Sequence, residues 1–341
     1  MLVFAFSFPS VQTRAAQWLT NDLNETYGTA IKIDKIELTY KGAVKIGAAS
    51  ALDHKKDTVL AFKELETSIL SFGDLFAGAP NLGDTRIDGL YFNMVRYKGD
   101  KKDNLMQFID KFSTSPATPS TKPFKLETGN LKLTNARANV IDEQSSLPIL
   151  FKARNMNLEA QSLAILDSDV NAAITDANFI MFTSAMRYGN EQDGLVVKQL
   201  KADFTYTREH ICATDLELTT AASTLQGDLA LNYGITGFTD FNNKVQWDFS
   251  IDRAQVSTNE LRYFYNEILP NEQLSLQGDM TGTLNDMVLK NLKAIALNDL
   301  EIDGDMHLIN LLDNRDAFFI EGTFNKIQAS SKDLESFYPT F

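Results

Sequence analysis

Residues 225–229 read LQGDL, and this short motif returns as LQGDM at 276–280 and as IDGDM at 302–306. A looser fourth copy, IEGTF, occupies residues 320–324. In each copy apolar residues alternate with polar ones, which is the period of a β-strand with one buried face. The glycine falls on the apolar face, where it marks a bend, a bulge or a close approach. The motif therefore predicts repeated strands in a curved sheet rather than a compact globule.

A larger unit repeats around this motif. The strand-like stretch 247–257 leads into a helix-like segment at 260–265, and the stretch 320–330 leads into a similar segment at 333–339. Gln255 and Gln328 are equivalent, so the unit returns after about 73 residues, a period typical of stacked supersecondary repeats. The sequence therefore favours an elongated, solenoid-like arrangement of strand groups.

Most of the remaining chain also alternates with the period of a strand, so we expect an antiparallel sheet with one apolar face. Two segments have helical spacing instead. Residues 11–27 form an amphipathic helix that places Val11, Ala15, Trp18, Leu19 and Leu23 on one side, and Gly28 follows at the C-cap position. Residues 103–112 form a shorter helix with Asp103 as its N-cap. A break in alternation at residues 34–35 predicts a bulge.

The prolines and small polar residues of 113–123 mark the clearest linker in the chain. We therefore divide the sequence into four parts, which are an anchor and amphipathic helix at 1–27, a β region with short helices at 28–112, the linker at 113–123 and a repeated-strand groove at 124–341.

The N-terminus begins with an apolar run that contains Leu2, Val3, Phe4, Phe6 and Phe8. A helix that crosses a bilayer needs about 20 such residues, and a cleavable signal has a basic residue before its apolar stretch. The run has neither property. We interpret it as the second half of a membrane anchor, and a short buried segment is the alternative.

The charge balance argues against a nucleic-acid partner. Lys and Arg number 32 against 45 Asp and Glu, which gives a net charge of −13. Proteins that hold a phosphate backbone carry a basic surface, which this composition does not supply. Cys212 is the single cysteine, so an intramolecular disulfide and a cysteine-rich zinc site are both excluded. We expect Cys212 to behave as a small hydrophobic residue.

No residue pattern indicates catalysis. His54, His210 and His307 are scattered, and the chain has no nucleophile elbow, phosphate loop or His-Glu-x-x-His motif. Residues 299–305 imitate the start of a calcium loop, but Glu301 stands where Asp or Asn is preferred and Asn310 stands in place of the final Glu. Because apolar residues alternate through this segment, it reads as a strand. We predict no enzyme activity, no metal site and no cofactor.

The apolar strand face is the remaining candidate site. It is either the closed core of a sandwich or an open groove for acyl chains, and the period of the sequence fits both. The candidate lining residues are Leu131, Leu133, Leu225, Leu229, Trp247, Phe249, Leu276, Met280, Ile302, Met306, Ile320 and Phe324.

The N-terminal third resembles the TamB family of translocation and assembly module proteins, in the AsmA-like superfamily and in the form found in Bacteroidota. The resemblance is specific over residues 1–112 and looser over 124–341. The stretches that carry it are FPSVQT (8–13), TYGTAIKI (26–33), KDTVL (56–60), KELETSIL (63–70), GD (83–84) leading into IDGLYFN (87–93), and YKG (97–99) before NL (104–105) and FIDKF (108–112).

The resemblance implies an inner-membrane anchor followed by a long, curved β-structure in the periplasm with an apolar inner groove. It also implies work with a BamA-like protein of the outer membrane, through a region that we expect to lie outside this sequence. The family is linked to outer-membrane protein assembly and to phospholipid movement between the two membranes, and it is not enzymatic.

Three functional hypotheses follow. The first is a passive groove that passes phospholipid between the inner and outer membranes. The second is an assembly factor whose sheet edges pair with strands of outer-membrane β-barrel clients. The third is a structural scaffold whose apolar face is a closed core.

Overall fold

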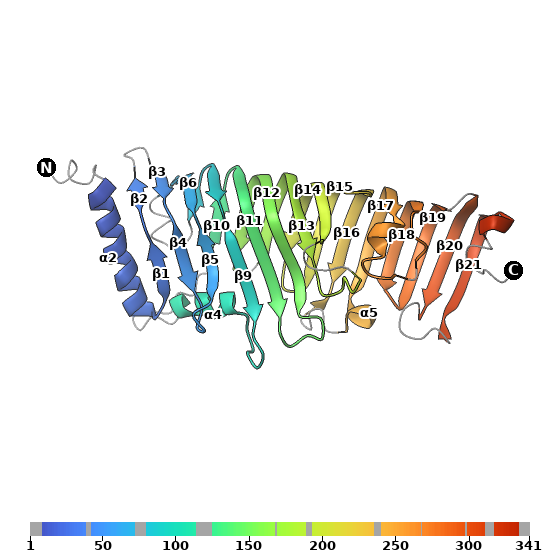
Figure 1. Cartoon of the computed structure of the whole chain (residues 1–341), viewed down its shortest axis with the longest axis horizontal. Coiled ribbons are helices and arrows are strands. Elements are labelled where there is room, and N and C mark those ends of the chain that lie inside the picture. The colour runs from blue at the N-terminus through green and yellow to red at the C-terminus, as the bar shows by residue number, and fades with distance from the viewer. Residues whose placement is uncertain are drawn as a thin grey trace. The chain divides into compact units, whose positions relative to one another are not determined.

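The computed structural model describes residues 9–38, 42–71, 80–113, 125–167, 169–188, 193–234, 240–266, 268–296, 299–310 and 317–333. The chain divides into two compact units. Unit 1 comprises residues 1–167 and 172–185, and unit 2 comprises residues 168–171 and 186–341. Each unit is mainly β with few short helices, and the strands form curved sheet that stays unclosed among the described strands, as the sequence predicts (Figure 1).

Unit 1 begins with the helix α2 and continues through thirteen strands and one further described helix. The elements are α2 (Pro9–Tyr27), β1 (Ala30–Ile33), β2 (Ile36–Leu38), β3 (Ala43–Ile46), β4 (Ala49–Leu52), β5 (Thr58–Phe62), β6 (Glu64–Ser68), β7 (Asn81–Leu82), β8 (Thr85–Asp88), β9 (Tyr91–Arg96), α4 (Asn104–Ser113), β10 (Lys125–Thr128), β11 (Leu131–Asp142), β12 (Ile149–Leu166) and β13 (Asp169–Phe182).

The early strands of unit 1 are short because each is one half of a bent strand. β1 pairs with β4 and β2 pairs with β3, both antiparallel. Between these halves the Asp34 N–H donates to the Ala48 carbonyl and the Gly47 N–H donates to the Lys35 carbonyl, each at 2.8 Å. The bulge predicted at residues 34–35 is therefore wrong. Residues 34–35 lie opposite residues 47–48, so neither strand carries the extra residue of a bulge, and the break in alternation is the bend between β1 and β2.

Unit 1 also contains parallel pairing, which alternation alone did not predict. β11 runs parallel to β8 and to β9, while it pairs antiparallel with β12. Parallel neighbours need a crossover connection, usually a helix. Here α4 begins that connection, and Asp103 caps it as predicted by accepting the Met106 N–H at 2.8 Å. Residues 114–123 of the predicted linker lie outside the described residues, so the four-part division stays a prediction.

The helix α2 covers the edge of the sheet formed by β1 and β2. Asn24 acts like a paired strand residue, because its side-chain oxygen accepts the Ile31 N–H and its NH₂ donates to the Ile31 carbonyl, both at 2.8 Å. Thr13 bonds both the N–H and the carbonyl of Ile36 at 3.3 Å. Covering an edge in this way removes a template for unwanted strand pairing. The predicted helix is confirmed, but Trp18, which the sequence places on its apolar side, is 71% exposed. The side chains of Val11, Ala15, Leu19 and Leu23 lie outside what the structure describes, so the apolar side stays a prediction.

Unit 2 is a simpler succession of antiparallel strands. Its elements are β14 (Leu195–Tyr206), β15 (His210–Thr220), β16 (Thr224–Asn232), α5 (Phe241–Lys244), β17 (Gln246–Ser257), α6 (Thr258–Leu261), β18 (Gln273–Thr283), β19 (Asp286–Ala296), β20 (Leu300–Ile309) and β21 (Phe319–Gln328). Each strand from β14 to β21 pairs with the next along the chain.

The repeated glycines sit where neighbouring strands approach most closely. A Cβ atom on Gly227 would lie 2.0 Å from the Ser250 carbonyl oxygen, and one on Gly304 would lie 2.3 Å from the Thr323 carbonyl oxygen. Both glycines have positive φ, +146° and +152°. Only a residue without a Cβ fits such positions, so the repeated motif marks the bend, as its glycine predicts.

The predicted repeat is visible as two sets of four strands, β14–β17 and β18–β21. Gly227 on β16 faces Ile251 on β17, and Gly304 on β20 faces Phe324 on β21. Each set ends in a short helical turn that begins just after β17 or β21. Unit 2 therefore consists of two structurally equivalent four-stranded modules.

An acidic side chain occupies the same place in both terminal turns. The Glu260 carboxylate accepts the Ala222 N–H at 3.1 Å, and Ala222 lies in the turn between β15 and β16. The Asp333 carboxylate accepts the Asp299 N–H at 3.2 Å, and Asp299 lies in the turn between β19 and β20. Each terminal turn is thus tied to the hairpin that precedes the last strand of its own module.

Candidate functional site

The candidate site is the apolar face of unit 2, which we define by four rows of residues that run across its strands. Strand register places the members of a row side by side. Row one contains Phe204, Ala213, Leu229, Phe249, Met280, Leu289, Met306 and Gly322. Row two contains Tyr206, Ile211, Leu231, Trp247, Gly282, Met287, Leu308 and Ile320. Row three contains Leu200, Leu218, Leu225, Ala254, Leu276, Ala294, Ile302 and Ile327.

The fourth row, the glycine row, follows the bend. It alternates glycine with a large apolar residue, and its members are Leu216, Gly227, Ile251, Gly278, Leu292, Gly304 and Phe324. Each large side chain therefore stands beside a position that has no side chain. This alternation lets the strands bend sharply without leaving the row empty.

All predicted lining residues of unit 2 lie on this one face. Leu229, Phe249, Met280 and Met306 belong to row one, and Leu225, Leu276 and Ile302 belong to row three. Trp247 and Ile320 belong to row two, and Phe324 to the glycine row. The register therefore places on one face predicted residues from five strands, β16, β17, β18, β20 and β21.

Leu131 and Leu133 have a different environment. Both are buried in the core of unit 1 with Ala136 and Ala160, and half-buried neighbours such as Met156 pack against them. A buried side chain offers little surface to a ligand, so in this structure these two residues contribute packing. The predicted anchor residues Leu2, Val3, Phe4, Phe6 and Phe8 lie outside the described part of the chain. Within that part, no helix combines the length and apolar character that a membrane crossing requires.

The large side chains of row one are partly exposed. Leu229, Phe249, Met280, Leu289 and Met306 are all half-buried. By contrast, Ala254 in row three is 1% exposed. The middle of the apolar face is thus accessible across five successive strands.

Trp247 contributes a polar group, its indole N–H, to the apolar face. Its indole Nε1 is buried, and no group in the described structure accepts its hydrogen. Its ring packs against Phe249, with 4.8 Å between ring centroids, and edge-on against Phe241 at 5.9 Å. A buried N–H without an acceptor costs about 1–3 kcal/mol, and this donor is unsatisfied among the described residues.

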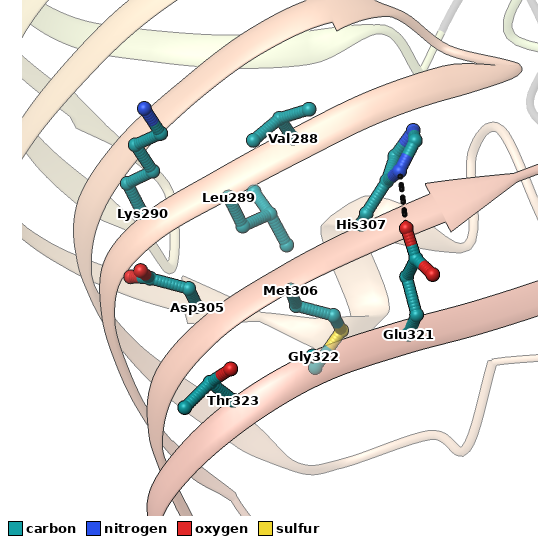
Figure 2. A pocket seen from close by; sticks show the side chains of 9 residues that line it. All are labelled: Val288, Leu289, Lys290, Asp305, Met306, His307, Glu321, Gly322 and Thr323. Carbon is teal, nitrogen blue, oxygen red and sulfur yellow. Dashed lines mark hydrogen bonds and ion pairs between the residues drawn. The ribbon is translucent and has the colours of Figure 1, made fainter.

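A depression of about 340 Å³ lies on β19, β20 and β21, at the end of row one (Figure 2). Gly322 stands there beside Met306, in the place that Phe249 occupies in the first module. The rim is polar. His307 reaches Asp286 on β19 through Nε2 at 2.6 Å and Glu321 on β21 through Nδ1 at 3.3 Å.

These two carboxylates raise the pKa of His307 above its ordinary value, and the hydrogen bond to Asp286 has the larger effect. Burial raises the pKa of the Cys212 thiol, with a further contribution from Asp228, so the thiol stays protonated. That state fits the inert role expected for Cys212.

The segment that imitates a calcium loop is a strand, as predicted. Residues 300–309 form β20. The carboxylates of this segment bond protein groups, since Glu301 pairs with Lys326 at 2.5 Å and Asp303 accepts from Asn325 at 2.9 Å. Across the described ranges, no group of three or more His, Cys, Asp or Glu residues is arranged to hold a metal ion.

A polar cluster in unit 1 was not anticipated from the sequence. Tyr97 Oη lies 2.7 Å from Asp53 and 2.9 Å from Asp57, and Asn104 donates to Asp53 at 3.0 Å. Burial and the hydrogen bond to Asp53 raise the pKa of Tyr97. Burial also opposes ionisation of Asp53, but hydrogen bonds from Asn104 and Tyr97 outweigh it and lower the pKa of that carboxyl. The cluster joins the turn after β4, the end of β9 and the start of α4.

In a comparison with known proteins, no protein-family model and no curated protein matches the chain.

Proposed function

We propose that this chain is a non-enzymatic periplasmic protein of the translocation and assembly module type, which passes phospholipid along its apolar face between the inner and outer membranes. The proposal includes an N-terminal inner-membrane anchor and a BamA-like partner in the outer membrane. It is supported by the resemblance of residues 1–112 to the TamB family and by the apolar rows that continue across β14–β21.

The observation that carries the proposal is the partial exposure of row one. A closed sandwich core would bury Phe249, Met280 and Met306 almost fully, as Ala254 is buried at 1% exposure. Instead these three large side chains are half-buried. Apolar surface of this extent, continuous over several strands, is typical of a binding site for apolar chains.

The unpaired Trp247 N–H gives the proposal a polar element. An ester carbonyl of a glycerophospholipid is an acceptor that can enter an otherwise apolar site together with its acyl chains. Tryptophan suits such a boundary because its ring is apolar and its N–H is polar.

Transfer along the face needs no chemical step. Burial of an acyl chain stabilises the complex by about 0.8 kcal/mol per CH₂ group, and this interaction has no preferred direction. Each row presents similar side chains on successive strands, so neighbouring positions have similar affinity. A lipid can therefore move from strand to strand while its headgroup stays in water.

The test is lipid mass spectrometry on the whole chain, purified in mild detergent and then delipidated by competition. Met280→Asp places a charge on row one, and Gln277→Asp places the same charge on the exposed face of the same strand. We expect near-stoichiometric phospholipid with the unchanged protein and with Gln277→Asp, and loss of lipid with a folded Met280→Asp variant.

Two outcomes would count against the proposal. Failure of Met280→Asp to fold would indicate a closed core, where an unpaired charge costs several kcal/mol. A well-folded unchanged protein without bound lipid would remove the basis of the transport function.

A further inference from the structure

Two arginines of unit 1, Arg137 on β11 and Arg154 on β12, face each other across neighbouring strands. The register of these strands shifts between Ala136 and Ala138, so Arg137 faces two residues, Arg154 and Asn155. One residue opposite two is the geometry of a β-bulge. Asn155, with a φ of +52°, is the extra residue, which leaves Arg154 as the partner of Arg137.

Both arginines lie on the polar face of the sheet. Ala136, which directly precedes Arg137, is 0% exposed, and Ala153, which directly precedes Arg154, is 3% exposed. Because successive side chains of a strand point to opposite faces, the two arginines point away from the core that buries these alanines. The side chain of Arg137 is exposed and that of Arg154 is half-buried.

Unit 2 has the same pair of positions, occupied by opposite charges. Lys290 on β19 and Arg154 on β12 each precede an asparagine with a φ of +52°, at a shift in register. Lys290 pairs with Asp279 on β18, and Arg137 holds the place of Asp279 in unit 1. Like charges directly opposite each other destabilise a pair of strands, whereas opposite charges stabilise it. Unit 1 therefore carries a repulsive pair where unit 2 carries an attractive one.

The positive charge of the two arginines is not compensated by the chain. Among the described residues, neither guanidinium group has a hydrogen-bond or ion-pair partner, and the Nε atom of Arg154 is buried. A carboxylate is supplied elsewhere on the same two strands, since Lys132 on β11 pairs with Glu159 on β12 at 2.6 Å. Burying part of a charged group without a partner adds to the cost of the repulsion.

The neighbouring side chains on this face are neutral and bond one another. Asn139 donates to Tyr91 Oη at 3.2 Å and to Asn93 at 3.1 Å, and Asn157 accepts the Asn135 N–H at 3.2 Å. None of these bonds uses either arginine. The two guanidinium groups are therefore left available to an anion from outside the chain.

We infer that Arg137 and Arg154 bind a phosphate monoester on the polar face of unit 1. A phosphate monoester carries a charge of about −2 at neutral pH, which two guanidinium groups balance, whereas one suffices for a carboxylate. The planar fork of an arginine matches two oxygens of a phosphate. A bound dianion replaces the repulsion between the arginines by attraction of both to one group. The inference is independent of the lipid proposal, since it uses the opposite face and the other unit.

The test is a nuclear magnetic resonance titration of the whole chain, carrying ¹⁵N-labelled arginine, with inorganic phosphate at constant ionic strength. The Nε–H of Arg154 is buried and thus shielded from exchange with water, so its signal can be followed. We expect a saturable shift of this signal with half-saturation at about 1 mM phosphate. Acetate should need a concentration about tenfold higher or more, because its single charge leaves one arginine unbalanced.

Variants of the chain locate the anion. Arg137→Gln removes one charge from an exposed side chain, and we expect it to raise the half-saturating phosphate concentration at Arg154 by about tenfold or more. Arg253→Gln is the matched control, because Arg253 is an exposed arginine of β17 that bonds Gln226 at 3.1 Å. This control should leave the titration unchanged. Far-ultraviolet circular dichroism should be the same for all three proteins.

Vesicle sedimentation distinguishes two sources of the phosphate group. Phosphatidylcholine vesicles with added phosphatidic acid present a monoester, and those with added phosphatidylglycerol present only diesters. Binding to the phosphatidic acid vesicles alone, lost in Arg137→Gln, would assign the site to a lipid headgroup. A phosphate titration that saturates without vesicle binding would assign it to a soluble ester. Both results support the site.

Four outcomes of the titration would overturn the inference. These are absence of a saturable shift with phosphate, equal half-saturation with acetate, an unchanged titration in Arg137→Gln, and an equal rise in Arg253→Gln. Because the titration contains no phospholipid and follows a residue of unit 1, its failure leaves the lipid proposal standing.

Discussion

The side chain of Asp228 on β16 accepts the backbone N–H of Asp215 on β15 at 2.8 Å. Asp215 has a φ of +50° and lies in the irregular step where the register of β15 shifts. The second module repeats this relationship, since Asp305 accepts the N–H of Asn291, whose φ is +52°, at 2.9 Å. The aspartate of the repeated motif therefore accepts a backbone N–H at the irregular step of the preceding strand in both modules.

Replacing Asp228 with alanine should destabilise the protein by about 1 kcal/mol, because the Asp215 N–H loses a charged acceptor and retains only water. Urea unfolding monitored by circular dichroism measures the change. Asp248→Ala is the control, since Asp248 is an exposed aspartate on the polar face of β17. Equal midpoints for the two variants would show that the hydrogen bond contributes nothing to the bend.

Replacing Gly227 with alanine should have a larger effect, about 2–4 kcal/mol, because the new Cβ would overlap the Ser250 carbonyl and the backbone has positive φ. Gly234 provides the comparison. Its φ is +56°, and a Cβ there would meet nothing within 4 Å, so Gly234→Ala should cost only about 1 kcal/mol. A cost for Gly227→Ala no greater than that of Gly234→Ala would mean that close approach does not account for the repeated glycine.

The strands, and the bend or close approach at the repeated glycine, could be predicted from the sequence because both depend on local residue patterns. Alternation over β16, β18 and β20 placed their apolar residues on one face, and a glycine inside a strand usually marks a bend or a close approach. The role of Asp228 was missed because its partner lies on a different strand, thirteen positions earlier. The alternation of residues along one strand does not indicate which residue of another strand a side chain contacts.

Other misses have the same origin. The parallel pairing of β11 with β8 and β9 depends on a crossover whose direction the residues of 113–123 do not encode. The burial of Asp53 with Tyr97 and Asn104 joins positions 44 and 51 residues apart. The exposure of row one, which separates an open face from a closed core, is a property of the whole sheet and therefore had to be observed.

The ion pairs of His307 with Asp286 and Glu321 predict that the free energy of unfolding depends on pH. The folded-state pKa of His307 is raised above the ordinary value near 6.5, so protonated His307 favours the folded state. This contribution is fully present below the unfolded-state pKa and is lost as the pH rises through the folded-state pKa. Urea midpoints across this range should fall with increasing pH, and they should fall less in His307→Gln.

Nuclear magnetic resonance titration separates the two carboxylates that face His307. Asp286→Asn should lower the pKa of His307 more than Glu321→Gln does, because Asp286 has the shorter contact, 2.6 Å against 3.3 Å. The opposite order, or an ordinary pKa in the unchanged protein, would contradict the ion-pair geometry.

Trp247 offers a direct spectroscopic test of the apolar face. The chain has two tryptophans, and Trp18 is 71% exposed, so Trp18→Phe leaves Trp247 as the single reporter. Addition of a short-chain diacyl phosphatidylcholine below its micelle concentration should shift the Trp247 emission to the blue, because acyl chains exclude water from the ring.

The ether-linked analogue lacks the ester carbonyls and should bind several-fold more weakly if the unpaired indole N–H donates to one. Trp247→Phe removes that donor, and it should bind the ester and the ether lipid with equal affinity when binding is followed by isothermal titration calorimetry. Retention of the ester preference in Trp247→Phe would show that another group recognises the carbonyl, and an unshifted Trp247 emission at saturating lipid would place the lipid away from row two.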